Sequence, residues 1–309
     1  MEVETRFRAM GTDVYVVVVG GSLRMVDLAR DFIDDLEARW SRFRLTSEVS
    51  LLNLMAGRTV RVSSQTLSLV QRALEGARLT GGRFYPTVLG DVIRAGYDRS
   101  FELLTEEPPG GASALRTGFM GIVVDEAGSM VSLPDGVGFD PGGVGKGYAA
   151  DLLVQELLSR GATGVCANVG GDLRVEGEAS GGAAWMIAIA HPFRSTPAAS
   201  VGLRAGGVAT SMRTRRTWGP ADDRRHHLID PASGEQARSG LASVSVVAAE
   251  GWLAEVVAKA AFMAGPTDGL GLLASIGVEG VLIDDAGSAH PSTGFGRFTE
   301  RTETRRHTV

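Results

Sequence analysis

The sequence predicts an α+β fold, with a single large domain of mixed or antiparallel sheets and flanking helices. Three observations lead to this prediction. Short valine-rich runs end at glycine pairs, as buried strands do, and longer segments carry apolar residues at three- and four-residue steps, as helices do. The 309 residues (32.4 kDa) show neither a linker nor a clean repeat with a period of roughly 20–50 residues, which disfavours a solenoid or a propeller.

Local patterns place the elements along the chain. Residues 14–19 predict a strand, because valine dominates the run and two glycines end it. Residues 24–40 predict a helix with one apolar and one acidic face, and residues 65–79 predict another, capped by Ser63 or Ser64. The same criteria give a surface loop at 106–111, a glycine-rich turn at 140–147 leading into a helix that ends at Arg160-Gly161, a strand at 165–169, short strands around Arg174, Ile187, Leu203 and Ile229, a strand at 243–247, a helix at 250–264 stopped by Gly265-Pro266, and a strand at 278–283.

The composition excludes several classes of protein. A formal net charge of −5 and a pI near 5.6 give no field that would draw nucleic acid. No export signal is visible, and no apolar run approaches the roughly 20 residues of a membrane-spanning helix. We therefore expect a cytoplasmic protein with no nucleic-acid partner and no membrane insertion. Residues 1–300 are expected to form the domain and residues 301–309 a flexible tail, and Cys166 is expected to be a buried, inert thiol.

The two lysines stand out because all the other basic residues are arginines. A lysine kept in this background suggests a task for a compact ammonium group. Lys146 ends a glycine-rich stretch that leads into a predicted helix, where backbone N–H groups and the helix dipole can meet a phosphate. The stretch matches neither the Walker loop nor the dinucleotide fingerprint, so a plain helix-entry turn remains an alternative. The simpler interpretation of Lys259 is an exposed pair with Glu255, one helical turn earlier.

Two polar clusters mark the last third of the chain. His226 and His227 lie where a predicted strand runs into a Pro/Gly turn, a place where active sites are often built, although solvated histidines would look the same. The preceding basic cluster suits phosphate or carboxylate recognition, or it protects an edge strand from pairing. That cluster consists of Arg213, Arg215, Arg216, Arg224 and Arg225.

These segments, in chain order, resemble the ApbE-like flavin transferases, which move FMN from FAD onto a Ser or Thr of an acceptor protein. The resemblance covers nearly the whole chain, and its strength lies in eight motifs in the family's order and spacing. The motifs are Met10-Gly11-Thr12, Ser41-Arg42-Phe43-Arg44 with Ser47 and Leu52-Asn53, residues 80–88, residues 140–147, Asn168-Val169-Gly170-Gly171-Asp172, Ala209-Thr210-Ser211, residues 227–234, and Ala254-Glu255 through Gly265.

The resemblance implies a T-fold-related α+β architecture with FAD in a deep cleft. It also implies which residues take part. FAD contacts are implied for Met10, Phe43, Arg83, Phe84, Tyr85, Asp140, Lys146 and Ile229, and Mg²⁺ is implied at the Gly143 carbonyl and at the positions of Glu255 and Lys259. The implied reaction is attack of an acceptor hydroxyl on the FMN-side phosphorus of FAD, with AMP leaving. In it, His227 accepts the hydroxyl proton and Lys146 supplies positive charge at the pyrophosphate.

The chain departs from the family pattern at the metal. The family ligands on that helix are Asp and Thr, whereas this chain has Glu255 and Lys259. Lys259 cannot bind a cation, and an ammonium beside Glu255 competes with a metal for the carboxylate. Two alternatives follow, in which Mg²⁺ keeps its place or Lys259 reaches the pyrophosphate instead. Two other activities also stay open, namely FAD binding without transfer and hydrolysis of FAD to FMN and AMP.

Overall fold

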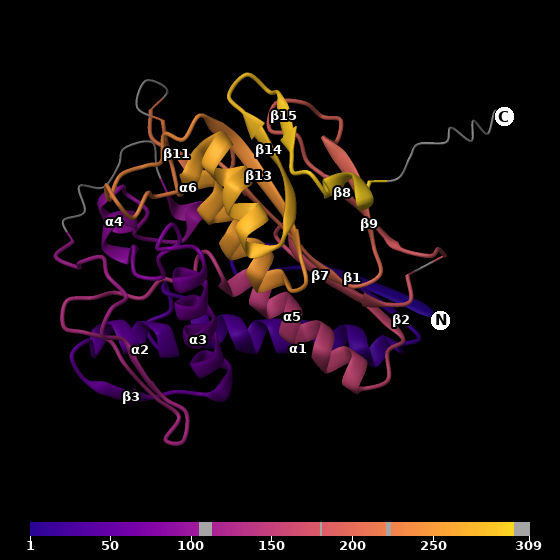
Figure 1. Cartoon of the computed structure of the whole chain (residues 1–309). Helices are drawn as coiled ribbons and strands as arrows, with labels where there is room; N and C mark the ends of the chain where they lie inside the picture. The colour runs from indigo at the N-terminus through magenta and orange to yellow at the C-terminus, as the bar shows by residue number, and fades with distance from the viewer. Residues whose placement is uncertain (105–112, 180, 221–223, 300–309) are drawn as a thin grey trace.

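An antiparallel sheet forms the centre of the computed structural model, which describes residues 1–104, 113–179, 181–220 and 224–299 (Figure 1). Within these residues the sheet has eight strands. In spatial order they are β1 (Glu2–Ala9), β2 (Thr12–Val19), β6 (Gly164–Val169), β7 (Asp172–Gly177), β10 (Gly206–Met212), β13 (Leu241–Ala248), β14 (Glu279–Asp284) and β15 (Ala289–Pro291). The valine run of β2 is buried because that strand pairs with a neighbour on each side and both faces of the sheet are covered.

Three long helices pack on one face of this sheet, and a hairpin covers part of the other (Figure 1). The helices are α1 (Leu23–Trp40), α5 (Gly145–Ser159) and α6 (Gly251–Ile276), and the hairpin is β8 (Trp185–Ile189) with β9 (Ala199–Leu203). Side chains alternate along β2, so Val16 packs under the helices while Val17 packs under the hairpin. The result is a layered α+β domain with antiparallel sheets, as the sequence predicts.

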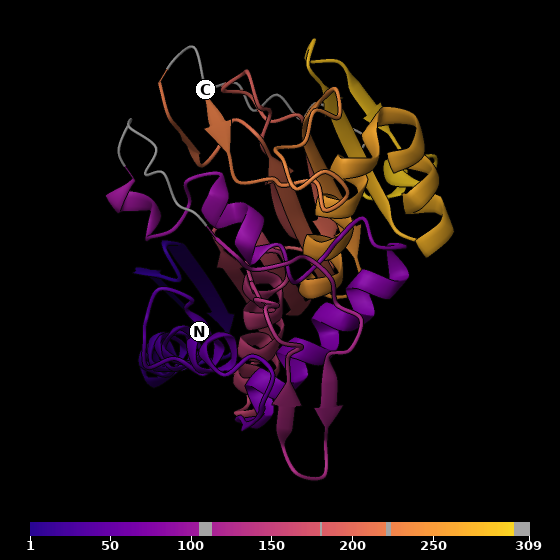
Figure 2. The same ribbon diagram turned by 90° about the vertical axis from the view of Figure 1, so that its left-hand side faces the viewer.

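Most of the remaining elements lie beside the helical layer, and Figure 2 shows the hairpin of β4 and β5 projecting from it, whereas η2 packs with the β8–β9 hairpin on the other face of the sheet. The remaining elements are α2 (Glu48–Leu54), β3 (Thr59–Arg61), α3 (Ser64–Leu79), α4 (Leu89–Arg94), η1 (Phe101–Leu103), β4 (Val123–Asp125), β5 (Met130–Ser132), β11 (Thr217–Trp218), β12 (Arg225–His226) and η2 (Phe295–Arg297). The cap of α3 is Ser63, whose hydroxyl accepts the Thr66 N–H, and the Glu48 carboxylate accepts the Ser63 N–H. That carboxylate therefore ties the end of α3 to α2.

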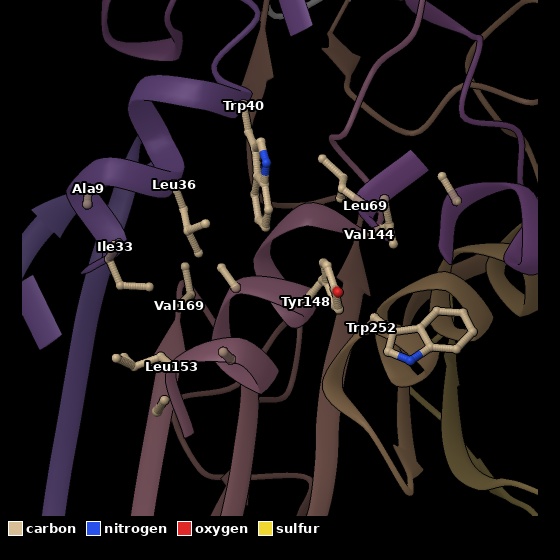
Figure 3. Close-up of a cluster of buried hydrophobic side chains, with 14 of the residues drawn as sticks. Ala9, Ile33, Leu36, Trp40, Leu69, Val144, Tyr148, Leu153, Val169 and Trp252 are labelled. Atoms are coloured by element: carbon tan, nitrogen blue, oxygen red, sulfur yellow. The ribbon is translucent and has the colours of Figure 1, made fainter. Parts of the chain in front are cut away.

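Aromatic side chains join the three long helices (Figure 3). Trp40 at the end of α1 stacks on Tyr148 of α5, with ring centroids 5.9 Å apart and planes 13° from parallel. Trp252 in the first turn of α6 is almost completely buried in the same core. These large rings pack together where α5 and α6 begin. Both helices begin beside the candidate site.

Most predicted elements are confirmed within a residue or two, but two predictions are wrong. The helix over 250–264 was expected to stop at Gly265-Pro266. Gly265 does break the helical backbone (φ 82°), yet a further helical stretch then runs on to Ile276, because proline suits the first turn of a helix. Around Ile229 no strand forms, and Ile229 makes an isolated bridge to Gln236.

Sequence patterns do not indicate some of the elements, and two predicted segments fall outside the described residues. The sequence patterns did not indicate β1, α2 or α4, which are short or strongly polar. The loop predicted at 106–111 and the tail predicted at 301–309 lie outside the described residues. Among the described helices, none is both long enough and apolar enough to cross a membrane.

Candidate active site

The turn between β1 and β2 brings Met10 to the edge of a pocket lined by several aromatic side chains. Met10 and Gly11 both have positive φ (52° and 62°), as the two central residues of a type I′ hairpin turn must. The Glu37 carboxylate of α1 accepts the Met10 N–H at 2.9 Å. This hydrogen bond to α1 therefore stabilises a backbone conformation that methionine rarely adopts.

The glycine-rich turn leads into α5 through a compact set of backbone bonds. The Pro141 carbonyl accepts the N–H groups of Gly143 and Gly145, both at 2.8 Å, and Asp140 Oδ1 accepts the Gly142 N–H at 3.0 Å. Lys146 then follows in the first turn of α5. The turn is thus a helix entry that also carries a lysine, and phosphate binding by its N–H groups stays a prediction.

Helices α5 and α6 cap each other. The Asp151 carboxylate of α5 accepts the N–H groups of Gly251 and Trp252 at 2.7 and 2.9 Å, and Glu255 of α6 accepts the Gly147 N–H at 2.8 Å. Close contact requires glycine, since a Cβ on Gly147 would lie 2.3 Å from the Gly251 carbonyl oxygen. Burial raises the pKa of Asp151 to about 6, against the effect of its two N–H donors.

The two lysines have different partners. The Lys146 ammonium donates to Asp172 and, at 3.1 Å, to Glu255 Oε1. The Lys259 ammonium instead donates to the Gly142 carbonyl at 3.0 Å, and Glu255 is not its ion-pair partner, contrary to the simpler interpretation of the sequence. Burial lowers the pKa of both lysines, and the charge of Glu255 opposes this shift in each.

His227 presents a neutral imidazole to the pocket. Its Nδ1 is buried and has no hydrogen-bond partner within the described structure. Burial holds the pKa of His227 well below its usual value, and the nearby positive charges of Lys259 and Arg216 lower it further. A neutral imidazole that lines a pocket can accept a proton from a bound hydroxyl.

One pocket gathers most of the residues predicted to act. Those that line it are Met10, Phe43, Arg83, Tyr85, Asp140, Lys146, His227, Ile229 and Lys259. The structure places three others behind the lining. Phe84 is buried in the core against Gly76 and Gly143, Gly143 itself is buried beside Lys259, and Glu255 lies beneath Lys146.

Part of the aromatic wall of this pocket was not predicted from the sequence. Trp40 and Tyr97 line it, and the Arg42 guanidinium lies 4.2 and 4.6 Å from the ring centroids of Phe43 and Tyr97. Arg42 also donates to the Tyr97 carbonyl, which orients the wall. The position of Arg42 next to Phe43 in a family motif was the available signal for its role.

The arginine cluster divides between two places. Arg216 lines the same pocket as His227, whereas Arg213, Arg224 and Arg225 line a separate hollow. Arg215 is exposed. Cys166 is half-buried rather than fully buried as expected. Desolvation raises the pKa of its thiol to about 12, which disfavours the reactive thiolate.

The residues at the implied metal position do not fit Mg²⁺. Both carboxylate oxygens of Glu255 are engaged, by the Lys146 ammonium and by the Gly147 N–H, and Lys259 places a positive charge beside Gly143. Among the described residues, no three His, Cys, Asp or Glu side chains group as a metal site. Mg²⁺ requires an octahedron of oxygen ligands, which this arrangement does not offer.

Comparison with known proteins identifies the family of this chain and agrees with its fold. Residues 10–282 match the model of the ApbE family. A Salmonella typhimurium protein named FAD:protein FMN transferase is 30% identical over 263 residues, which cover 79% of this chain and 75% of that protein. One of the same name from Rhodobacter capsulatus is 30% identical over 78% of this chain, but the match spans 47% of its length.

Solved structures extend the likeness to the fold. The crystal structure of the ApbE protein from Thermotoga maritima superposes with a TM-score of 0.87 at 28% identity, covering 97% of this chain and all of that one. The flavin transferase ApbE from Vibrio cholerae superposes with a TM-score of 0.82. With a family match over most of its length and the motif residues assembled in one pocket, the chain belongs to the ApbE family.

Proposed function

We propose that this chain transfers the FMN part of FAD to a Ser or Thr hydroxyl of an acceptor flavoprotein and releases AMP. Relatives in its family are named for that reaction. The observation that carries the proposal is the pocket itself, which combines aromatic side chains, two lysines and a histidine whose pKa is held low.

The lining suggests how FAD lies. Phe43 and Tyr85 offer flat apolar surfaces on which a flavin ring can stack. Lys259 lies where the glycine-rich turn enters α5, the helix that carries Lys146 in its first turn. This place suits the pyrophosphate, because an ammonium group and the start of a helix both favour negative charge. Arg216 adds positive charge to the same pocket.

The chemical step is an in-line displacement at phosphorus. The acceptor oxygen forms a bond to the FMN-side phosphorus while the bond from that phosphorus to the bridging oxygen breaks, and AMP leaves with the bridging oxygen. His227 takes the hydroxyl proton, for which its low pKa keeps it ready. The chain contributes positioning and positive charge, and this assignment uses no metal ligand.

The test is an assay with FAD and an acceptor domain that carries a Ser or Thr flavinylation site. We expect intact-mass spectrometry to show one FMN added to the acceptor, with AMP released in equal amount. The same domain with its acceptor residue changed to Ala is the control and should gain no mass. AMP and free FMN without an adduct would identify an FAD pyrophosphatase, and bound FAD without AMP would identify a binding protein.

His227→Ala tests the assigned proton acceptor. The variant should still bind FAD but transfer more slowly by a factor on the order of 10²–10⁴, the usual contribution of general-base catalysis. FAD affinity is measured by fluorescence titration and transfer by intact mass. Transfer at the parent rate would remove the imidazole from the mechanism.

A further inference from the structure

The positive charges of the two lysines are balanced to different degrees. Lys146 is shared between two carboxylates, those of Asp172 and Glu255, which more than neutralise it. Lys259 forms no ion pair with a carboxylate within the described residues, and its hydrogen-bond acceptor is the neutral carbonyl of Gly142. Of these two pocket lysines, Lys259 is therefore the one whose charge remains available to a bound anion.

The place of this ammonium is set by the fold. Lys259 lies one turn after Glu255 on α6, and Glu255 is bonded to the Gly147 N–H of α5. The Lys259 Nζ is close enough to the glycine-rich turn that a Cβ on Gly143 would lie 2.6 Å from it. An ammonium thus occupies the space between α6 and the turn where the family likeness implies Mg²⁺. Both carboxylate oxygens of Glu255, which a metal there would need, already accept hydrogen bonds.

We propose that the Lys259 ammonium takes the place of the divalent metal in this chain. It binds the pyrophosphate of FAD and stabilises the negative charge that develops on the AMP oxygen as the phosphorus–oxygen bond breaks. FMN transfer by this protein then needs no divalent cation. Lys146 acts differently, since it ties Asp172 of β7 to Glu255 of α6 and so positions the helix that carries Lys259. The inference rests on the proposed transfer reaction.

The experiment compares the parent protein with Lys259→Met and Lys259→Thr. Methionine keeps the aliphatic stem without the charge, and threonine restores the oxygen-bearing residue of the family pattern. Arg160→Met is the matched control, because it removes one positive charge from the opposite end of α5. For each protein, AMP release and FMN adduct are measured after EDTA treatment and again with added Mg²⁺, and melting temperature confirms folding.

A second measurement does not depend on turnover. FAD and riboflavin affinities are determined by fluorescence titration in EDTA. Because riboflavin lacks phosphate, Lys259→Met should weaken FAD roughly 10- to 100-fold, as expected for a lost charged hydrogen bond, and leave riboflavin unchanged. Arg160→Met should change neither affinity.

The outcomes separate this inference from the proposed function. Transfer by the parent that survives EDTA and is lost in Lys259→Met supports the inference. Transfer that EDTA abolishes and Mg²⁺ restores overturns it and leaves the transferase function standing. Lys259→Thr at the parent rate in EDTA also overturns it. If no protein releases AMP under any condition, the transferase proposal fails, and the FAD-against-riboflavin comparison alone decides the role of Lys259.

Discussion

Met10 shows how a strained residue can be retained at a binding site. Its left-handed backbone conformation is unfavourable for a side chain of this kind by roughly 1–2 kcal/mol. Asparagine would suit the turn better, since Asn-Gly is the preferred pair in a type I′ hairpin. Met10 lines the pocket, and we predict that contact with the ligand is the physical reason for methionine at this position.

Two substitutions at Met10 test this account. Met10→Asn and Met10→Val both remove the pocket contact, but a β-branched residue tolerates positive φ least. We expect Met10→Val to be less stable than Met10→Asn by about 1–2 kcal/mol in urea unfolding, with FAD affinity reduced in both. Equal stability of the two variants would show that the turn conformation is not decisive.

The lowered pKa of His227 predicts how the transfer rate depends on pH on the acid side. Because its pKa lies well below the usual value of 6.5, the imidazole stays neutral, and able to accept a proton, as pH falls to 6.5. The transfer rate should therefore show no loss from protonation of His227 between pH 8 and 6.5, with the acidic limb lying lower. The pH dependence of kcat and the imidazole NMR titration give the measurement. A limb centred above 6.5 that coincides with the His227 titration would contradict it.

At the scale of elements, the site depends on two helices that cap each other. Asp151 reaches from α5 to the start of α6, and Glu255 reaches from α6 to the start of α5. The glycines at their contact, Gly147 and Gly251, let the two backbones approach closely enough for both bonds. The separation of these helices sets the distance between Lys146 and Lys259, so helix packing and pyrophosphate binding are linked.

Gly147→Ala tests that link. The added Cβ would lie 2.3 Å from the Gly251 carbonyl oxygen, so the helices must move apart. We expect a loss of about 1–3 kcal/mol of unfolding free energy, typical of overpacking, together with weaker FAD binding. Gly271→Ala in α6 is the control, because a Cβ there meets nothing within 4 Å and the substitution should stabilise α6 by up to about 1 kcal/mol. Equal effects of the two variants would exclude the packing explanation.

At the scale of the whole molecule, the sequence predicts elements that have local signals but not the contacts between segments far apart in the chain. Helices α1, α3 and α5 carry their own periodicity and stop signals, and the structure places them as expected. The further helical stretch after Gly265 was missed because a Gly-Pro pair is both a stop and a start signal. Phe84 was expected at FAD because the family motif over residues 80–88 includes it with Arg83 and Tyr85. The structure buries it in the core, for which the local sequence holds no distinguishing signal.

The partners of the lysines could not be predicted from the sequence alone. Lys146 and Glu255 are 109 positions apart, and their contact exists because α5 and α6 cross at two glycines. A helical pattern places Glu255 and Lys259 one turn apart and suggests that they pair. At the helix crossing, Glu255 instead forms an ion pair with Lys146, and Lys259 donates a hydrogen bond to a carbonyl of the glycine-rich turn.

The pocket is built from segments far apart in the chain, which predicts how FAD affects the whole protein. Met10 comes from the β1–β2 turn, Tyr85 from the loop after α3, and Lys259 from α6. Proteins open locally in separate units, so a ligand that touches all three residues should make these elements open together. FAD at 100 times its dissociation constant should stabilise the protein by about 2.7 kcal/mol.

Hydrogen exchange distinguishes this connection from simple local binding. FAD should slow exchange in residues 41–44, 83–87 and 140–148 together, because its flavin and pyrophosphate ends reach different elements. Riboflavin should protect the first two segments, which form the aromatic end, and leave 140–148 unchanged because it has no phosphate for the lysines. Lys259→Met should reduce the FAD-dependent protection of 140–148 and keep that of 41–44. If FAD and riboflavin protect the same segments to the same extent, the pyrophosphate does not reach the glycine-rich turn, and the assignment of the two ends of the pocket is wrong.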